Sequence, residues 1–270
     1  MPFKPSQSGD FSGKVYLVTG ATHNAKVYLA ARSEQKASEA IEDILLKVSH
    51  ANISFIKLDM MDLASVVTSP REFLTKEPHL HGLIDNAGIM AAPYTESVDG
   101  YESQPQTDYL SHWLLTHHLL PALHFAAGTS TPGDMRIINV TSNGHNLFAP
   151  KGGIDFSDMK KTSGTPWSSY GMSKLVNILH ARELNRLYGP ASEGAAGRQI
   201  WTASVHPGSV DTTYTSLFAA ASNEFKRTES GEYFVPLAKK VKPSKDALDV
   251  DLAKKLWVWA EDELQNRGFI

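Results

Sequence analysis

A tyrosine and a lysine stand four residues apart in the segment YGMSK, as Tyr170 and Lys174. In a helix, residues with this spacing lie on one face, about one turn apart. An ammonium a few ångströms from a phenol stabilises the phenolate, so the phenol becomes usable as a general acid or base near neutral pH. Such a pair also arises by chance, so its significance depends on the residues that accompany it. One companion is Ser142, which follows the apolar segment RIINVT and could hydrogen-bond a substrate oxygen.

The elements that must position these side chains alternate between apolar strands and amphipathic helices. We predict strands at 14–19, 26–31, 53–58, 83–84, 136–141 and 200–205. We predict helices at 34–48, 62–76, 106–123, 168–188 and 247–264. This order predicts a single α/β domain over residues 1–270, a doubly wound parallel sheet of the Rossmann type with a flexible N-terminus at 1–12. In such folds, ligands bind outside the carboxyl ends of the strands.

Composition excludes several classes of protein. The net charge is −3, which gives no basic face for nucleic acid, and there is no cysteine for disulfides or thiolate chemistry. The polar N-terminus has no signal-peptide core, and no apolar stretch is long enough to span a membrane. We therefore expect a cytoplasmic protein. The paired histidines His117 and His118 point about 100° apart on a helix, so we expect no metal site.

Six short segments, one of which contains the Tyr/Lys pair, follow one another in a fixed order. They are VYLVTG, LD at 58–59, NAG at 86–88, NVTS at 139–142, YGMSK at 170–174 and HPGSVDT at 206–212. Together they resemble the short-chain dehydrogenase/reductase family, over nearly the whole chain. Stretches such as IDNAGIM and SVHPGSVDT are most similar to its retinol-dehydrogenase-like and fungal branch.

The resemblance implies hydride transfer between a nicotinamide dinucleotide and a hydrophobic ketone, aldehyde or alcohol. Such substrates belong to lipid, retinoid-like or secondary metabolism. Tyr170 would donate or accept the proton. Lys174 would lower the pKa of Tyr170 and hold the nicotinamide ribose, and Ser142 would orient the substrate oxygen. The family also pairs through two long helices, here 104–125 and 168–188, which implies a possible homodimer.

The resemblance also assigns the cofactor contacts. They are Thr19, Gly20, Arg32, Asp59, Asn86, Ala87, Gly88, Tyr170, Lys174, Pro207, Gly208, Val210 and Thr212. Arg32 stands where an acidic residue would bind the ribose of NAD(H), and an arginine there suits the 2′-phosphate of NADP(H). We therefore expect NADP(H) rather than NAD(H). The alternatives are a solvated surface charge for Arg32 and plain turn chemistry for Gly88 and Gly208.

The glycine-rich motif of the family begins at Thr19-Gly20 and then stops, because Asn24 and Lys26 replace its later glycines. The next predicted strand follows at once, so the simplest account is that about eighteen residues, including the first helix, are absent. The diphosphate would then lose the helix N-terminus that holds it. We expect apolar residues beside the first strand to be exposed, or the second strand to be antiparallel or expelled. The alternative function is a catalytically impaired remnant that cannot bind the dinucleotide.

Other residues depart from the family or surround the site. Asp108 replaces the usual asparagine and would place a negative charge near Lys174, as a further catalytic residue, and Asp85 replaces another asparagine. Loop 143–167 is expected to shape the substrate pocket. Pro70 should interrupt its predicted helix, and Trp257 and Trp259 are expected to be packing residues.

Overall fold

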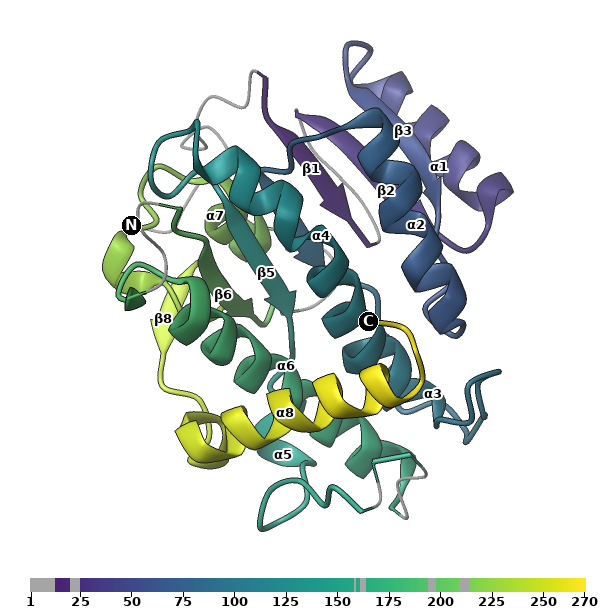
Figure 1. The fold of residues 1–270 in the computed structure, drawn as a ribbon, viewed down its shortest axis with the longest axis vertical. Coiled ribbons are helices and arrows are strands. Elements are labelled where there is room, and N and C mark those ends of the chain that lie inside the picture. Colours follow the sequence, from purple (N-terminus) through teal and green to yellow (C-terminus); the bar gives the residue numbers. More distant parts are fainter. Residues whose placement is uncertain (1–12, 20–24, 158, 161–163, 194–197, 209–213) are drawn as a thin grey trace.

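A twisted sheet runs through the centre of the protein, with helices on both of its faces (Figure 1). The computed structural model describes the whole chain except residues 1–12, 20–24, 158, 161–163, 194–197 and 209–213. The strands are β1 (Val15–Val18), β2 (Lys26–Ala31), β3 (Asn52–Lys57), β4 (Gly82–Asp85), β5 (Arg136–Val140), β6 (Trp201–Val205), β7 (Glu232–Val235) and β8 (Lys239–Val241).

The strand order is β3-β2-β1-β4-β5-β6-β7-β8, and each neighbouring pair is parallel except β7 and β8. The strands β3 to β6 follow the doubly wound order, in which successive strands are added on one side of β1 up to β3 and on its other side from β4 onward. The predicted fold class is therefore confirmed. Strands β7 and β8 were not predicted, because each is only three or four residues long.

The helices of the described residues match the predicted segments closely. They are α1 (Glu34–Lys47), α2 (Leu63–Lys76), α3 (Ser103–Pro105), α4 (Ser111–Ala127), α5 (Gly144–Leu147), α6 (Pro166–Tyr188), α7 (Tyr214–Ala221) and α8 (Val250–Asn266). A π-helical turn, Gln106–Leu110, joins α3 to α4. Short 3₁₀ turns lie at Arg227–Glu229 and Asp246–Leu248. The sequence did not indicate α3, α5 and α7, which are short.

Helix α2 continues through Pro70, so the expected interruption is wrong. An internal proline costs about 3 kcal/mol, because a backbone hydrogen bond is lost. Leu63, Val66 and Phe73 are fully buried on the inner face of α2, and each such side chain contributes about 1.5–3 kcal/mol. Burial of this face therefore outweighs the proline.

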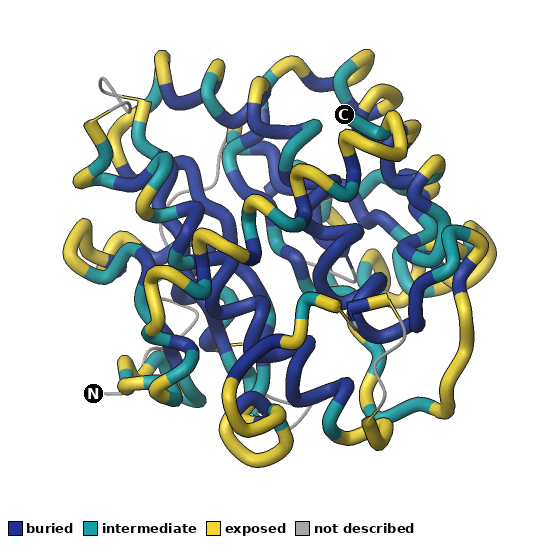
Figure 2. The backbone as a smooth tube through the Cα atoms, turned by 60° about the horizontal axis from the view of Figure 1, so that its bottom comes forward, coloured by how far each residue is buried: buried dark blue, intermediate teal, exposed yellow. Residues whose placement is uncertain are grey.

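The sheet has an apolar cluster on each face, and exposed residues lie mainly on the outer helices and loops (Figure 2). Tyr16 and Val18 of β1 are buried in the second cluster together with Phe218 of α7. The expected exposure beside β1 is therefore wrong. Helix α7 is held there by the buried guanidinium of Arg136, which donates to the carbonyls of Ala219 (2.9 Å) and Ser222 (2.8 Å).

Strands β1 and β2 are parallel neighbours, with Val15 opposite Lys26. This pairing excludes the antiparallel or expelled second strand. Residues 19–25 make the connection between the two strands, and 20–24 lie outside the described residues. Seven residues reach about 23–25 Å when extended, but only about 10 Å as a helix. The absence of about eighteen residues stays a prediction. Its main support is that two parallel neighbouring strands are joined by only seven residues, which is too short for a crossover helix.

Helix α8 packs across α6, and its Trp257 ring lies 5.1 Å from that of Trp113 in α4. Both Trp257 and Trp259 pack against the core, so their packing role is confirmed. Pairing of two copies through the helices at 104–125 and 168–188 stays a prediction. None of the described helices has the length and apolar character needed to cross a membrane.

Candidate active site

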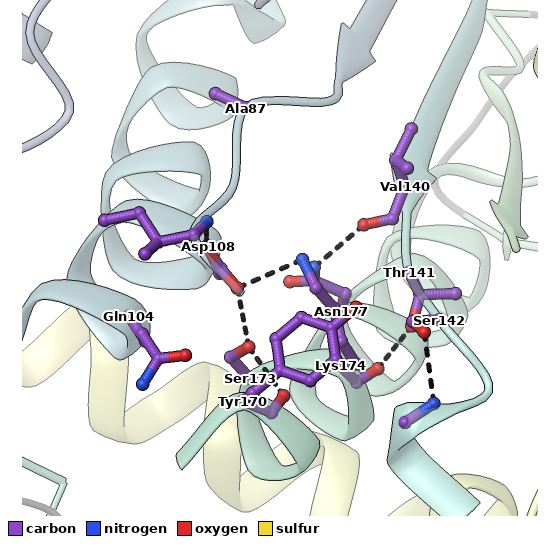
Figure 3. Close-up of polar contacts among 12 residues, drawn as sticks. Ala87, Gln104, Asp108, Val140, Thr141, Ser142, Tyr170, Ser173, Lys174 and Asn177 are labelled. Carbon is purple, nitrogen blue, oxygen red and sulfur yellow. Dashed lines mark hydrogen bonds and ion pairs between the residues drawn. The ribbon is translucent and has the colours of Figure 1, made fainter. Parts of the chain in front are cut away.

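Side chains from the ends of β4 and β5 and from two long helices meet at the carboxyl edge of the sheet (Figure 3). Helix α6 places Tyr170 and Lys174 there, and both are buried. Two hydrogen bonds dock α6 on β5: Thr141 Oγ1 donates to the Lys174 carbonyl at 2.6 Å, and Asn177 Nδ2 donates to the Val140 carbonyl at 3.1 Å. The Lys174 ammonium lies 5.4 Å from the centre of the Tyr170 ring. The structure thus brings the predicted pair together.

Ser142 follows β5 and reaches the same place through a close turn. Its Oγ accepts a hydrogen bond from the Gly144 N–H at 3.1 Å, which leaves its own hydrogen for another acceptor. A Cβ on Gly144 would lie 2.7 Å from the Tyr170 ring. Glycine is therefore required for this turn to pass against the tyrosine, and Ser142 and Tyr170 are held on either side of it.

Asp108 lies in the π-helical turn, completely buried. Its Oδ1 accepts the Ile89 N–H at 2.7 Å, and its Oδ2 accepts the Ser173 hydroxyl at 2.7 Å. The same Oδ2 lies 3.0 Å from the Lys174 ammonium. The predicted closeness of Asp108 and Lys174 is therefore observed as a buried ion pair, whereas a catalytic role for Asp108 stays a prediction.

Gly88 is exposed beside this ion pair. An added Cβ would lie 3.1 Å from Lys174 Nζ and 3.2 Å from Asp108 Oδ1. The φ of Gly88 is not in the left-handed region. Of the assigned glycines that the structure describes, Gly208 has a left-handed φ, +88°. For Gly88, turn chemistry alone is thus an insufficient explanation, because the missing side chain keeps the space over Lys174 open.

His112 was missed by the sequence analysis, although it follows Asp108 by one helical turn. Burial lowers the pKa of His112 to about 3, so the ring is neutral at pH 7. Its Nδ1 lies 3.2 Å from the Asp108 carbonyl, which can only accept, so Nδ1 carries the hydrogen. Its Nε2 lies 3.0 Å from Thr19 Oγ1. That hydroxyl also accepts the N–H groups of Asn86 and Ala87 at 2.8 Å each. Thr19 therefore positions the turn after β4, and any cofactor contact that it makes stays a prediction.

A further buried polar group lies beneath the site, at the end of β4. Burial raises the pKa of Asp85 well above its usual range. Its Oδ2 accepts the Thr116 hydroxyl at 3.4 Å, and its Oδ1 has no hydrogen-bond partner in the described part of the chain. Asn139 is the register neighbour of Asp85 on β5 and lies 3.1 Å, Oδ1 to Nδ1, from His180 of α6. A carboxylic acid, rather than a carboxylate, fits this uncharged setting.

The remaining assigned residues follow other strands of the same edge. Arg32 is exposed directly after β2, and Asp59 follows β3, where its Oδ1 accepts the Met61 N–H at 3.0 Å. Pro207 and Gly208 follow β6 and are half-buried. The assigned residues Gly20, Val210 and Thr212 lie outside the described residues. Within the described ranges, no group of three or more His, Asp or Glu side chains could hold a metal.

Comparisons with known proteins agree with this geometry. Residues 13–152 match the family model described as short chain dehydrogenase. The short-chain dehydrogenase/reductase drtF of Aspergillus calidoustus is 45% identical, over 100% of this chain and 99% of its own length. Retinol dehydrogenase 11 of Mus musculus is 36% identical, over 76% of this chain and 65% of its own.

Among solved structures, an uncharacterised protein from Mycobacterium paratuberculosis is similar with a TM-score of 0.78 and 28% identity, over 98% of both chains. The order of the strands, the side chains at their carboxyl ends and these relatives support one conclusion. The chain belongs to the short-chain dehydrogenase/reductase family of oxidoreductases.

Proposed function

We propose that the protein interconverts a hydrophobic ketone or aldehyde and its alcohol, using NADP(H). The observation that carries this proposal is the packing of Ser142 and Tyr170 around one turn, with the buried Lys174–Asp108 ion pair behind the tyrosine. Tyr170 would act as the proton donor, Ser142 as a hydrogen-bond donor and Lys174 as the charged group, all at one end of the sheet. A cytoplasmic location and a role in lipid, retinoid-like or secondary metabolism belong to the same proposal.

The described residues fit the nicotinamide ribose of a dinucleotide. Gly88 exposes bare backbone beside the Lys174 ammonium, and a side chain there would press on that ammonium. The ribose hydroxyls could therefore reach both groups without steric conflict. The bound dinucleotide would supply or accept the hydride.

In reduction, Ser142 would donate its hydroxyl hydrogen to the substrate carbonyl oxygen and hold it beside Tyr170. The Tyr170 hydroxyl would then donate the proton that this oxygen needs as the alcohol forms. Lys174 would stabilise the phenolate that remains. Asp108 would hold the ammonium in place through its 3.0 Å contact, and the Ser173 hydroxyl and Ile89 N–H fix its carboxylate.

The preference for NADP(H) rests on Arg32. Its exposed side chain directly follows β2, at the edge where Asp59 and Asn86 also follow their strands. A guanidinium can bind a phosphate with two parallel hydrogen bonds. An acidic residue at this place would instead bind the ribose hydroxyls of NAD(H).

A second candidate is an oxidoreductase remnant with impaired dinucleotide binding. The parallel pairing of β1 and β2 across seven residues favours it, because this connection lacks the length for a helix along the sheet. The alignment with drtF also spans 312 positions, more than the 270 residues of this chain, so the relative has segments without a counterpart here.

One titration separates the two candidates. NADPH is added to the purified protein, and energy transfer from tryptophan to the nicotinamide is followed. Saturable binding below millimolar NADPH, together with NADPH oxidation when a ketone is present, supports the first candidate. Absence of saturable binding supports the second.

A further inference from the structure

Three aromatic rings lie in a row at the mouth of the site. The Phe148 and Trp167 ring centres are 4.8 Å apart, and those of Trp167 and Tyr170 are 6.3 Å apart. Phe148 is 38% exposed and Trp167 is 47% exposed, whereas Tyr170 is only 8% exposed. The row thus leads from solvent to the proposed proton donor. We call Phe148 and Trp167 the aromatic platform.

The aromatic platform is held by specific backbone contacts. Gly171 of α6 allows the backbone at Phe148 and Ala149 to touch the helix, because a Cβ at this position would overlap both residues. The backbone at Phe148 and Ala149 is therefore fixed to α6 one residue after Tyr170. Any larger residue at position 171 would push Phe148 away.

The first turn of α6, which carries Trp167, has its own anchor. The buried side chain of Gln104 donates through Nε2 to the Pro166 carbonyl at 3.2 Å. Its Oε1 accepts the Ala91 N–H at 2.8 Å, so one side chain ties this turn to the segment that follows Gly88. The buried Gln104 amide thus positions both the first turn of α6 and the segment around Ala91.

An aromatic ring of this size gains stability when it is covered, yet nearly half of Trp167 faces solvent. Leu147, which precedes Phe148, and Met90, which precedes Ala91, are 64% and 65% exposed. Apolar side chains gathered at the rim of a site indicate a ligand that covers them. Rings prefer neighbours whose centres are about 4.5–7 Å away, offset or edge-on, which favours a planar aromatic group over an alkyl chain.

We propose that Trp167 determines substrate specificity by stacking the planar aromatic part of an aryl ketone or aldehyde, whose carbonyl group reaches Tyr170. This inference rests on the proposed function for the position of the carbonyl, and it names the class of substrate. Phe148 supports the Trp167 ring through their 4.8 Å contact. Gln104 is a positioning residue, because it acts through the backbone of Pro166.

The test measures binding of two ketones by calorimetry, without requiring turnover. 1-Acetonaphthone presents a planar bicyclic ring, and cyclohexyl methyl ketone presents an aliphatic ring. Trp167→Ala should weaken binding of 1-acetonaphthone about tenfold and change binding of the aliphatic ketone less than threefold. Trp167→Phe should restore most of the lost affinity. Phe125→Ala removes an exposed aromatic ring from α4, away from the site, and should change neither.

Several outcomes overturn the inference. They are equal losses for both ketones in Trp167→Ala, an unchanged affinity for 1-acetonaphthone, or no binding of this ketone to the wild type. Melting curves of each variant identify a folding defect, and Trp167→Phe keeps the test valid if Trp167→Ala is unstable. Failure of the proposed function gives a different result: the ketone binds in a Trp167-dependent way, but no NADPH is oxidised.

Discussion

The two halves of the carboxyl edge of the sheet differ in how they are held. Around β5 and α6, Lys174 is fixed by Thr141 and Asp108, so this half is positioned by contacts distant in sequence. Around β1 and β2, the two strands keep their parallel register although only residues 19–25 connect them. The parallel register of β1 and β2 and the contacts around α6 therefore persist together with a connection of only seven residues.

The difference follows from where the stabilising contacts lie. Strand β1 is paired on both sides and buried on both faces, and its Tyr16 and Val18 share an apolar cluster with Phe218 of α7. β1 is joined to the catalytic half by its pairing with β4 and by the Thr19 hydroxyl, which accepts the N–H groups of Asn86 and Ala87. Substitutions in each half should therefore affect different properties, chemistry in one and dinucleotide affinity in the other.

The largest effect is expected for Tyr170→Phe in the catalytic half. The ring still packs against Gly144, but the proton is lost, so kcat/KM should fall about 10²–10⁴-fold. The Kd for NADPH should stay within a factor of three. Tyr94→Phe, at an exposed tyrosine, is the control and should keep full activity. A Tyr170→Phe enzyme with near wild-type kcat/KM would exclude Tyr170 as the proton donor.

Asp108→Asn should lower the free energy of unfolding by about 3 kcal/mol, measured by urea denaturation at pH 7. The amide oxygen can still accept the Ile89 N–H, but the Lys174 ammonium loses its buried counter-charge. Glu72→Gln removes an exposed ion pair with Lys76 and should cost less than about 0.5 kcal/mol. Equal effects in the two variants would contradict a special role for the buried pair.

Asp85→Asn should make stability less dependent on pH. The pKa of Asp85 is raised by burial in the folded protein, and it is about 3.9 in an unfolded chain. Its contribution to stability is thus complete below about pH 4 and is lost as the pH rises toward the folded pKa, by about 1.4 kcal/mol per pH unit. Urea denaturation from pH 4 to 8 should show a wild-type stability that falls relative to the variant. Parallel curves would show that Asp85 ionises in the folded protein as it does in the unfolded chain.

Lengthening the connection between β1 and β2 so that it contains a helix should strengthen dinucleotide binding. An insertion of about eighteen residues after Gly20, containing a glycine-rich turn and a helix, should lower the Kd for NADPH at least about tenfold, because the diphosphate gains a helix N-terminus. A Gly/Ser linker of the same length is the control and should give no gain. Fluorescence energy transfer measures both, and equal affinities would show that the helix is unimportant.

The smallest effect is expected for Arg32→Ala. Loss of one exposed charge-assisted contact should reduce the preference for NADPH over NADH about five- to tenfold, measured as the ratio of the two Kd values. Lys36→Ala, an exposed position in α1, should leave this ratio unchanged. An unaltered ratio in Arg32→Ala would identify Arg32 as a solvated surface charge.

The residues that act through local spacing could be predicted. Tyr170 and Lys174 share a helix face, and Ser142 and Asn86 follow apolar strands, so the parallel order of the strands was enough to place them at one edge. The missed residues have no local signal. His112 becomes informative only when β1 brings Thr19 to it, and the aromatic platform exists because Gly171 admits the backbone of a distant loop.

The sequence by itself determined the α/β fold, the Tyr/Lys pair and the close spacing of the first two strands, because strand periodicity, helical spacing and chain length are local quantities. Only the tertiary structure decided that β2 lies parallel to β1, that α2 continues through Pro70 and that β1 shares an apolar cluster with α7. These outcomes depend on burial summed over distant segments. That sum outweighs the cost of one internal proline, and no short stretch of sequence contains it.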